Sequence, residues 1–325
     1  MVFTVNRFLR GLMVGLAVLA AGFVSTAMAE APMAKKQVPG YYRMMLGQFE
    51  VTALFDGAHD VDIGLMSNAT LPELQQLLAQ HGIEGSKVKT AVNAYLINTG
   101  KNLVLIDTGI GGVPGPQRGK VIDNLRAAGY EPEQVDTVLL THMHRDHVGG
   151  LVDTDGRMLF PNARVWANRL ESDFWLSEKQ AGEAKTDMLK SAFKIAQFST
   201  APYRAAGKWH LFQHKDEVVP GITAVLIAGH TPGHTLFRVK SDDQRLFVWG
   251  DLINSQVVQF ARPDVSLVFD VNPEQSVVTR YKVFNLAAKH KWLVAGAHLP
   301  YPGIGHVRSN GDGTYAWLPI PLIPE

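Results

Sequence analysis

The stretch Thr141-His-Met-His-Arg-Asp-His-Val-Gly-Gly150 places three imidazoles and one carboxylate within six consecutive positions. A turn here can direct His142 and His144 toward one metal ion, and Asp146 and His147 toward a second. Neutral imidazole and carboxylate suit zinc, and equally manganese, iron or cobalt, because these ions accept mixed nitrogen and oxygen ligands. The stretch therefore predicts one side of a two-metal site and leaves the identity of the metal open.

Three later motifs supply the remaining candidate ligands. GHTPGH (229–234), WGD (249–251) and AHLPYPG (297–303) add His230, Asp251 and His298, which brings the candidates to seven. A closed zinc site that only stabilises the fold needs four ligands and leaves no place for water. Seven candidates therefore favour two open metal ions. We expect the other histidines to lie on the surface or behind the ligands: His59, His81, His210, His214, His234, His290 and His306.

The order of these motifs resembles the metallo-β-lactamase superfamily, whose pattern is this histidine loop followed by a distant His, an Asp and a final His. The resemblance covers residues 48–306 and implies an α/β fold, the αββα sandwich, in which two mixed β-sheets flanked by helices lie face to face. It also implies a ligand set. His142, His144 and His230 would bind the first metal, Asp146, His147 and His298 the second, and Asp251 would bridge the two.

Short apolar runs rich in β-branched residues precede the ligand motifs, as expected for buried strands that end in functional loops. The predicted strands are 135–140, 222–227, 246–249 and 292–295, with a meander upstream formed by 50–55, 94–98 and 103–106. By the resemblance, Asp107 at the end of this meander would orient metal ligands from behind. Asp56 could act similarly. For both, a simple turn carboxylate is the alternative, because Asp is common in turns before Gly.

Two further segments are predicted to shape a pocket. Thr70 can cap a helix over 71–79, with a Glu three residues later for a capping box. Residues 168–198 carry apolar side chains at helical spacing, including Trp175 and Phe193. Core packing is the alternative for these two aromatic residues, because aromatic side chains are usually buried.

The N-terminal residues predict export. Residues 1–29 carry Arg7 and Arg10, then an apolar run at 11–24 and the cleavage pattern Ala27-Met-Ala29, which is typical of a secretory signal peptide. We expect cleavage after Ala29 and a periplasmic or secreted protein. The apolar run is shorter than the roughly 20 residues that span a bilayer, so no stable membrane anchor is expected.

Composition predicts one folded catalytic domain, because 46% of the 325 residues are hydrophobic and 19% are charged. We assign residues 30–40 to a flexible leader and 41–325 to the catalytic domain. Without the signal peptide the formal net charge falls from +1 to −1, because two arginines leave and no acidic residue does. A nearly neutral surface offers no field for nucleic acid, so we expect no nucleic-acid partner.

A closer resemblance is carried by YYRMMLG (41–47), THMHRDHVGG (141–150), DFWLS (173–177), GHTPGHT (229–235) and PGIGH (302–306). These stretches look like the methyl parathion hydrolase group, which adjoins the quorum-quenching lactonases. The resemblance implies a homodimer with a binuclear zinc-type site that cleaves phosphotriesters, aryl esters or lactones.

The candidate substrate pocket departs from the organophosphate-hydrolysing members of that group. Pro114 replaces an aromatic residue, and Asn254, Leu267 and Phe269 also differ. Trp175 and Phe193 are retained. We therefore expect hydrolysis of a small-molecule lactone or aryl ester, with organophosphate triester hydrolysis as a further activity to test.

The expected chemistry is attack on an ester, lactone or phosphotriester by a hydroxide that bridges two metal ions, which lower the pKa of bound water to about 7. Asp251 and Asp146 are the candidate catalytic residues: Asp251 would keep the ions together, and Asp146 would transfer a proton. One alternative is an N-acyl homoserine lactonase that acts in quorum quenching. Another, from a different class, is an exported metal-binding protein without turnover.

Overall fold

The computed structural model describes residues 31–35, 37–112 and 119–323, and the described residues from Pro39 onward form one compact unit. The predicted signal peptide and Pro114 lie outside the described residues. The described part of the predicted leader has no regular secondary structure before Tyr41. Among the described residues, no helix has both the length and the apolar character needed to cross a membrane.

Seven strands form the first sheet, in the order β1-β2-β4-β5-β6-β7-β8. Their bounds are Tyr41–Leu46 (β1), Phe49–Asp62 (β2), Lys87–Asn98 (β4), Leu103–Ile106 (β5), Thr137–Leu139 (β6), Arg164–Asn168 (β7) and Trp209–Phe212 (β8). Pairing is antiparallel from β1 to β5 and parallel from β5 to β8. The sheet is therefore mixed.

Seven strands also form the second sheet, in the order β16-β15-β14-β12-β11-β10-β9. Their bounds are Tyr315–Pro319 (β16), Ile304–Ser309 (β15), Leu293–Ala295 (β14), Gln244–Val248 (β12), Thr235–Ser241 (β11), Ile222–Leu226 (β10) and Glu217–Val219 (β9). Only β12 and β14 pair in parallel, so this sheet is mixed as well. A two-stranded sheet joins β3 (Met66–Ser67) to β13 (Ser266–Leu267).

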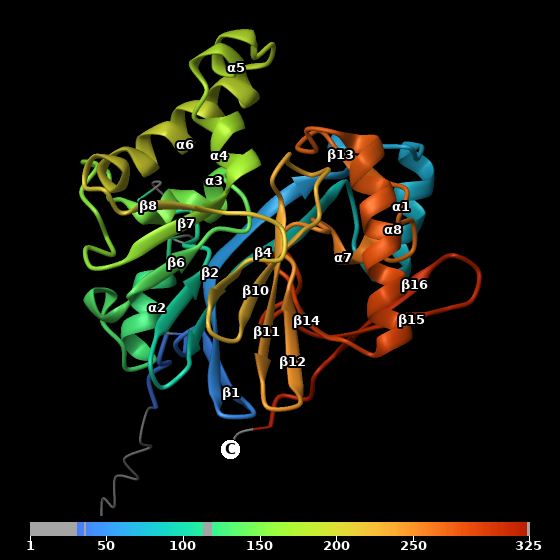
Figure 1. The fold of residues 1–325 in the computed structure, drawn as a ribbon. Coiled ribbons are helices and arrows are strands. Elements are labelled where there is room, and N and C mark those ends of the chain that lie inside the picture. The colour runs from blue at the N-terminus through green and yellow to red at the C-terminus, as the bar shows by residue number, and fades with distance from the viewer. Residues whose placement is uncertain (1–30, 36, 113–118, 324–325) are drawn as a thin grey trace, which may run out of the picture. The chain divides into compact units, whose positions relative to one another are not determined.

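Eight α-helices surround the sheets in the described residues (Figure 1). They are α1 (Leu71–Gln80), α2 (Val121–Ala127), α3 (Arg145–Val148), α4 (Arg169–Trp175), α5 (Glu178–Glu183), α6 (Asp187–Ala205), α7 (Gln256–Gln259) and α8 (Pro273–His290). Short 3-10 helices span Ile63–Leu65, Pro132–Gln134 and Gly149–Leu151. The capping box predicted at the start of α1 is present, because Thr70 and Glu73 each accept a hydrogen bond from the other's backbone N–H.

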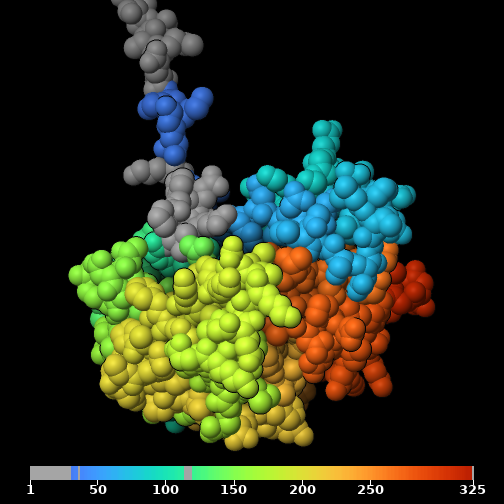
Figure 2. All heavy atoms as spheres, turned by 90° about the horizontal axis from the view of Figure 1, so that it is seen from above, coloured from blue at the N-terminus to red at the C-terminus, as the bar shows by residue number. Residues whose placement is uncertain are grey.

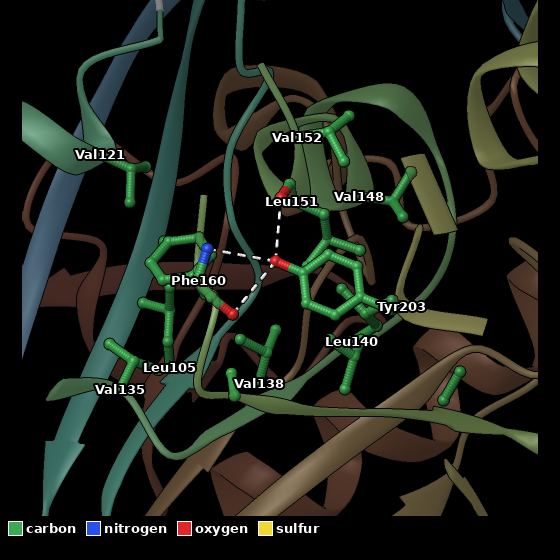
Figure 3. Packing of buried hydrophobic residues seen from close by; sticks show 14 of the residues in the cluster. Leu105, Val121, Val135, Val138, Leu140, Val148, Leu151, Val152, Phe160 and Tyr203 are labelled. Carbon is green, nitrogen blue, oxygen red and sulfur yellow. Dashed lines mark hydrogen bonds between the residues drawn. The ribbon is translucent and has the colours of Figure 1, made fainter. Parts of the chain in front are cut away.

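Successive side chains of a strand point to opposite faces of its sheet, so the apolar side chains of one strand pack into two different cores. In β5, Val104 and Ile106 pack between the two sheets, whereas Leu103 and Leu105 face the core beneath α2 and α6. A third core lies between the second sheet and α8. Figure 3 shows part of the core beneath α6, where the Tyr203 hydroxyl accepts from Phe160 N (3.1 Å) and donates to Leu151 O (3.0 Å). The layers are helix, sheet, sheet and helix, which confirms the predicted αββα sandwich.

Candidate metal centre

The histidine loop leaves β6 and is fixed by its central residue. Met143 is fully buried in the core beneath α6, and its backbone N–H donates to Glu171 Oε1 (2.9 Å). Because Met143 points into this core, its neighbours His142 and His144 are directed to the opposite side, where their ring nitrogens lie 3.1 Å apart. The loop then enters α3, which carries Asp146 and His147.

Gly149 and Gly150 let the preceding loop pack directly on this segment. A Cβ at Gly150 would lie 1.9 Å from Thr108 O, and one at Gly149 would lie 2.6 Å from Ile110 O. Such contacts are far inside van der Waals distance, so the backbone itself would have to move. The paired glycines of the motif are thus explained by close backbone approach.

Gly150→Ala is therefore expected to lower the free energy of unfolding by about 3 kcal/mol, because the new methyl group meets backbone rather than a flexible side chain. Urea unfolding followed by circular dichroism measures this. Gly182→Ala is the matched control, since Gly182 lies in α5 with open space around it and should gain up to about 1 kcal/mol. Equal stability of Gly150→Ala and the parent protein would contradict the close-approach explanation.

The first cluster contains His142, His144, His230 and Asp251. His144 Nδ1 lies 3.1 Å from His142 Nε2 and 3.0 Å from His230 Nε2. Asp251 Oδ2 lies 3.4 Å from His230 Nε2 and 3.8 Å from His142 Nε2. Donors each bonded at about 2.0–2.1 Å to one tetrahedral ion are about 3.3 Å apart. The observed distances bracket this value, so the cluster can hold one ion.

The second cluster contains Asp146, His147 and His298, and Asp251 also faces it. Asp146 lies 3.8 Å from His147 Nε2 through Oδ1 and 3.4 Å from His298 Nε2 through Oδ2. Asp251 lies 3.0 Å from His147 Nε2 through Oδ1 and 2.9 Å from His298 Nε2 through Oδ2. Asp251 therefore lies between the two clusters.

At this junction His147 Nε2 and Asp251 Oδ1 are buried and lie 3.0 Å apart, yet the geometry gives neither atom a hydrogen bond, to the other or to another described residue. Buried polar atoms are nearly always paired, so an unpaired nitrogen and an unpaired carboxylate oxygen facing one point require an explanation. A divalent cation between them would supply the missing partner. The seven side chains thus fit a metal centre.

The other ring nitrogens are held from behind. His147 Nδ1 lies 2.9 Å from Asp107 Oδ2, and His230 Nδ1 lies 2.8 Å from Asp270 Oδ1. His298 Nδ1 lies 2.8 Å from the carbonyl oxygen of Ala91. Such contacts fix the ring orientation and direct each Nε2 toward the centre.

Burial and charge set different protonation states in the two clusters, and only the neutral imidazole binds a metal ion. Burial lowers the pKa of His142 well below its ordinary value and that of His144 to about 3, so both are neutral. Burial also acts to lower the pKa of His298, but the Asp251 and Asp146 carboxylates outweigh it and raise this pKa to about 9. Burial alone would raise the pKa of Asp251; the surrounding histidines hold it well below its usual range.

The two aspartates predicted to support the ligands from behind, Asp107 and Asp56, have different partners in the structure. Asp107 accepts from Thr141 N (2.8 Å) in addition to its contact with His147. Asp56 is buried and accepts from Ile110 N (3.0 Å) and Val121 N (3.2 Å), so it holds the backbone of a neighbouring loop rather than a histidine. Burial raises its pKa.

Two of the other histidines lie close to the centre, and a third lies away from it. His234 is buried and accepts a hydrogen bond from Asp251 N (3.1 Å). His59 lines the cavity above the centre and meets the His298 ring edge-on at 5.9 Å. His306 contacts Trp292 O and lines a separate groove near the end of α8.

Two buried carboxylates were not predicted from sequence. Glu171 of α4 accepts hydrogen bonds from both ligand loops, and Asp270 contacts His230 and Ser276. Neither belongs to a ligand motif. The one signal for Glu171 is its helical spacing from Phe174 and Trp175, since a charged side chain on the same face as aromatic residues of the core requires partners.

A cavity of about 560 Å³ opens over both clusters. Figure 2 shows the segments that supply its walls meeting at one face, with α6 in yellow-green, residues 251–271 in orange and the β2–β4 region in blue to cyan. The apolar wall consists of Val61, Ile110, Met188, Leu189, Ala192, Ile195, Val268, Phe269 and Val271. The floor is polar and contains His144, Asp146, Asp251 and His298.

The predicted pocket residues separate into two groups. Asn254 and Phe269 line the cavity. Trp175, Phe193 and Leu267 do not line it and are buried in the core. Trp175 and Phe193 pack against each other behind His144, with 4.8 Å between their ring centroids. Their large apolar faces are removed from water there, which is the core-packing alternative.

Comparison with known proteins gives consistent similarities. Residues 88–274, more than half of the chain, match the metallo-β-lactamase superfamily. The crystal structure of hydrolase AbOPH in the β-lactamase superfamily is 38% identical, with a TM-score of 0.84, over 89% of this chain and 100% of that one. AidC, a dizinc quorum-quenching lactonase solved with a product, is 26% identical, with a TM-score of 0.79, over 88% of this chain and 99% of that one.

A curated relative gives a weaker match. An N-acyl homoserine lactonase from Bacillus sp is 24% identical over 177 residues, which are 49% of this chain and 62% of the relative. The chain therefore spans less than two thirds of that relative.

Proposed function

Because this chain belongs to the metallo-β-lactamase superfamily and is a metal-dependent hydrolase, we propose that it cleaves lactones or aryl esters at a two-metal centre. The observation that carries this proposal is the place of Asp251, whose carboxylate lies between two His/Asp clusters on the floor of an apolar cavity. The similarity to hydrolases and lactonases weighs against a metal-binding protein without turnover.

The ligand assignment follows the two clusters. His142, His144 and His230 would hold one ion, Asp146, His147 and His298 the other, and Asp251 both. We favour zinc, because the donors are imidazole and carboxylate and AidC is a dizinc enzyme. When bound, two such ions polarise the substrate oxygen and lower the pKa of water toward neutrality.

The chain's own groups supply orientation and proton transfer. Asn254 Nδ2 donates to Asp251 Oδ2 (2.9 Å) and fixes the carboxylate between the clusters. The Asp146 side chain is 19% exposed, against 3% for Asp251. Asp146 is therefore the more exposed of these two carboxylates on the cavity floor, and it is placed to pass a proton to the leaving alkoxide or phenoxide.

The apolar part of the cavity favours uncharged, aliphatic acyl groups. The apolar part of its wall is made of aliphatic side chains and Met188 apart from Phe269, which is the only aromatic ring besides histidine among the described lining residues; Arg145, Thr186 and Ser191 add polar groups. A wall with one phenyl ring offers little stacking for the aryl group of an organophosphate. This favours lactones with an aliphatic acyl group over organophosphate triesters. A quorum-quenching N-acyl homoserine lactonase is the second candidate, favoured by the similarity to AidC.

We also propose export with cleavage after Ala29, on the strength of the basic and apolar N-terminal residues. The mass of the protein recovered from the periplasm or the medium tests this, since the mature chain would begin at Glu30. We further propose a homodimer, from the resemblance to the methyl parathion hydrolase group, and no nucleic-acid partner, from the near-neutral formal charge.

The substrate proposal is tested by measuring kcat/KM on an aryl lactone, a long-chain N-acyl homoserine lactone and methyl parathion side by side. A lactone is expected to give the highest value. In Ala192→Phe a phenyl group on α6 would fill part of the cavity and leave less room for a long acyl chain. We therefore expect kcat/KM for the long-chain lactone to fall about tenfold more than kcat/KM for the aryl lactone.

Ala201→Phe is the matched control, because Ala201 is exposed on the same helix and does not line the cavity. Its rates should equal those of the parent protein. A dominant rate on methyl parathion would reject the lactone assignment, and no turnover on any of the three would reject the substrate proposal as a whole.

A further inference from the structure

Glu171 is a fully buried carboxylate that accepts four hydrogen bonds. Oε1 accepts from Met143 N (2.9 Å) and Trp175 Nε1 (2.6 Å). Oε2 accepts from Thr231 Oγ1 (2.8 Å) and Gly233 N (2.8 Å). A buried charge without partners would be strongly destabilising. The four donors that converge on this carboxylate therefore compensate for its burial.

Three of the four donors come from two loops that belong to different sheets, and the fourth, Trp175, lies in α4 itself. Met143 lies between His142 and His144 in the loop after β6, in the first sheet. Thr231 and Gly233 lie in the loop between β10 and β11, in the second sheet, next to His230. One carboxylate therefore joins the two loops that together supply the histidines of the first cluster.

Glu171 and Gly233 are so close that residue 233 has no room for a side chain. A Cβ at Gly233 would lie 2.4 Å from Glu171 N and 2.6 Å from Glu171 Cβ. α4 and the loop are thus in direct backbone contact, and Glu171 holds them there. His144 Nδ1 and His230 Nε2, one from each loop, lie 3.0 Å apart as a result.

We infer that Glu171 is a positioning residue for the first metal ion: its carboxylate fixes the His142–His144 loop relative to His230. This inference rests on the proposed two-metal function. Asp107 and Asp270 each contact one histidine, whereas Glu171 contacts no ligand side chain and acts on the two loop backbones. Its effect should therefore fall on the first ion and spare the second.

Glu171→Gln tests this inference. The amide oxygen can still accept from two donors, but the amide nitrogen would face either Gly233 N or Met143 N, which are also donors. One loop should shift, and the affinity for one of the two ions should fall about 10- to 100-fold. Cobalt content and cobalt absorption, followed during titration with a chelator, measure this without substrate.

The expected result is loss of one cobalt ion per chain at a chelator concentration where the parent protein keeps two, with the second ion held at parent affinity. Glu183→Gln, the same change at an exposed position in α5, should keep both ions. If Glu171→Gln does not fold, Thr231→Val removes one donor to the carboxylate and should weaken the same ion by about threefold.

Two results would overturn the inference: parent affinity for both ions in Glu171→Gln and Thr231→Val, or equal weakening of both ions. Failure of the proposed function looks different, because the parent protein would then not bind two ions at all. The cobalt titration of the parent protein separates these cases before any variant is compared.

Discussion

Asp251→Ala is expected to lower kcat/KM by about 1,000-fold or more, equivalent to about 4 kcal/mol of transition-state stabilisation, while the protein stays folded. The Asp251 carboxylate oxygens lie within 3.8 Å of ring nitrogens from both clusters. No other carboxylate in the described residues contacts histidines of both clusters. Without it, the two clusters lose their shared ligand.

The measurement is kcat/KM on the preferred substrate together with metal content and circular dichroism. Asp251→Asn separates charge from shape, because it keeps a side-chain oxygen beside Asn254 Nδ2 and removes the negative charge. Asp243→Asn is the matched control, because Asp243 is exposed in the turn between β11 and β12, at the other end of the strand that leads to Asp251. Full activity in Asp251→Ala would refute its place in the metal centre.

The seven candidate ligands could be predicted because each belongs to a short motif at the end of an apolar run. The chemistry of a metal site is expressed in residue type and spacing, and strand ends bring distant motifs together. The predicted strand at 103–106 matches β5, and the capping box at the start of α1 is formed as predicted. In these elements local pattern and tertiary structure agree.

Strand ends were less predictable where pairing is long-range. The strand predicted over 50–55 extends to Asp62 as β2, beyond a bulge between Phe55 and Gly57. Its outer half carries polar residues such as His59 and Asp60 and is held by pairing with the extended β4. Conversely, β6 begins at Thr137 rather than at 135, because Val135 caps the 3-10 helix Pro132–Gln134 and its N–H donates to Pro132 O.

The pocket wall illustrates a different limit. Apolar residues at helical spacing in α6 indicate an amphipathic helix but not which side meets the metal centre. Phe193 is buried in the core, whereas Leu189, Ala192 and Ile195 face the cavity. Glu171 and Asp270 could not be predicted for a related reason. Neither belongs to a sequence motif, and the partners of each carboxylate come from loops that are distant in sequence and contact it only in the folded protein.

Metal removal is expected to cost stability as well as activity. The Asp251 carboxylate is buried next to four imidazoles, and bound cations would neutralise its negative charge and that of Asp146. An ion present at 1,000 times its Kd stabilises the folded state by about 4 kcal/mol, so extraction should lower Tm by roughly 10 °C. Chelator dialysis followed by thermal unfolding and activity assays measures both effects.

Adding back zinc, manganese, iron or cobalt one at a time then identifies the ion that the site prefers. The preferred ion should restore both Tm and kcat/KM at the lowest concentration, because occupancy of the same site governs the two quantities. Asp251→Ala serves as the control: its Tm should respond less to each ion, since the shared ligand is gone. Full activity in protein shown by elemental analysis to be metal-free would contradict a metal-dependent mechanism, and recovery of Tm without recovery of activity would indicate that the added ion binds but does not support hydrolysis.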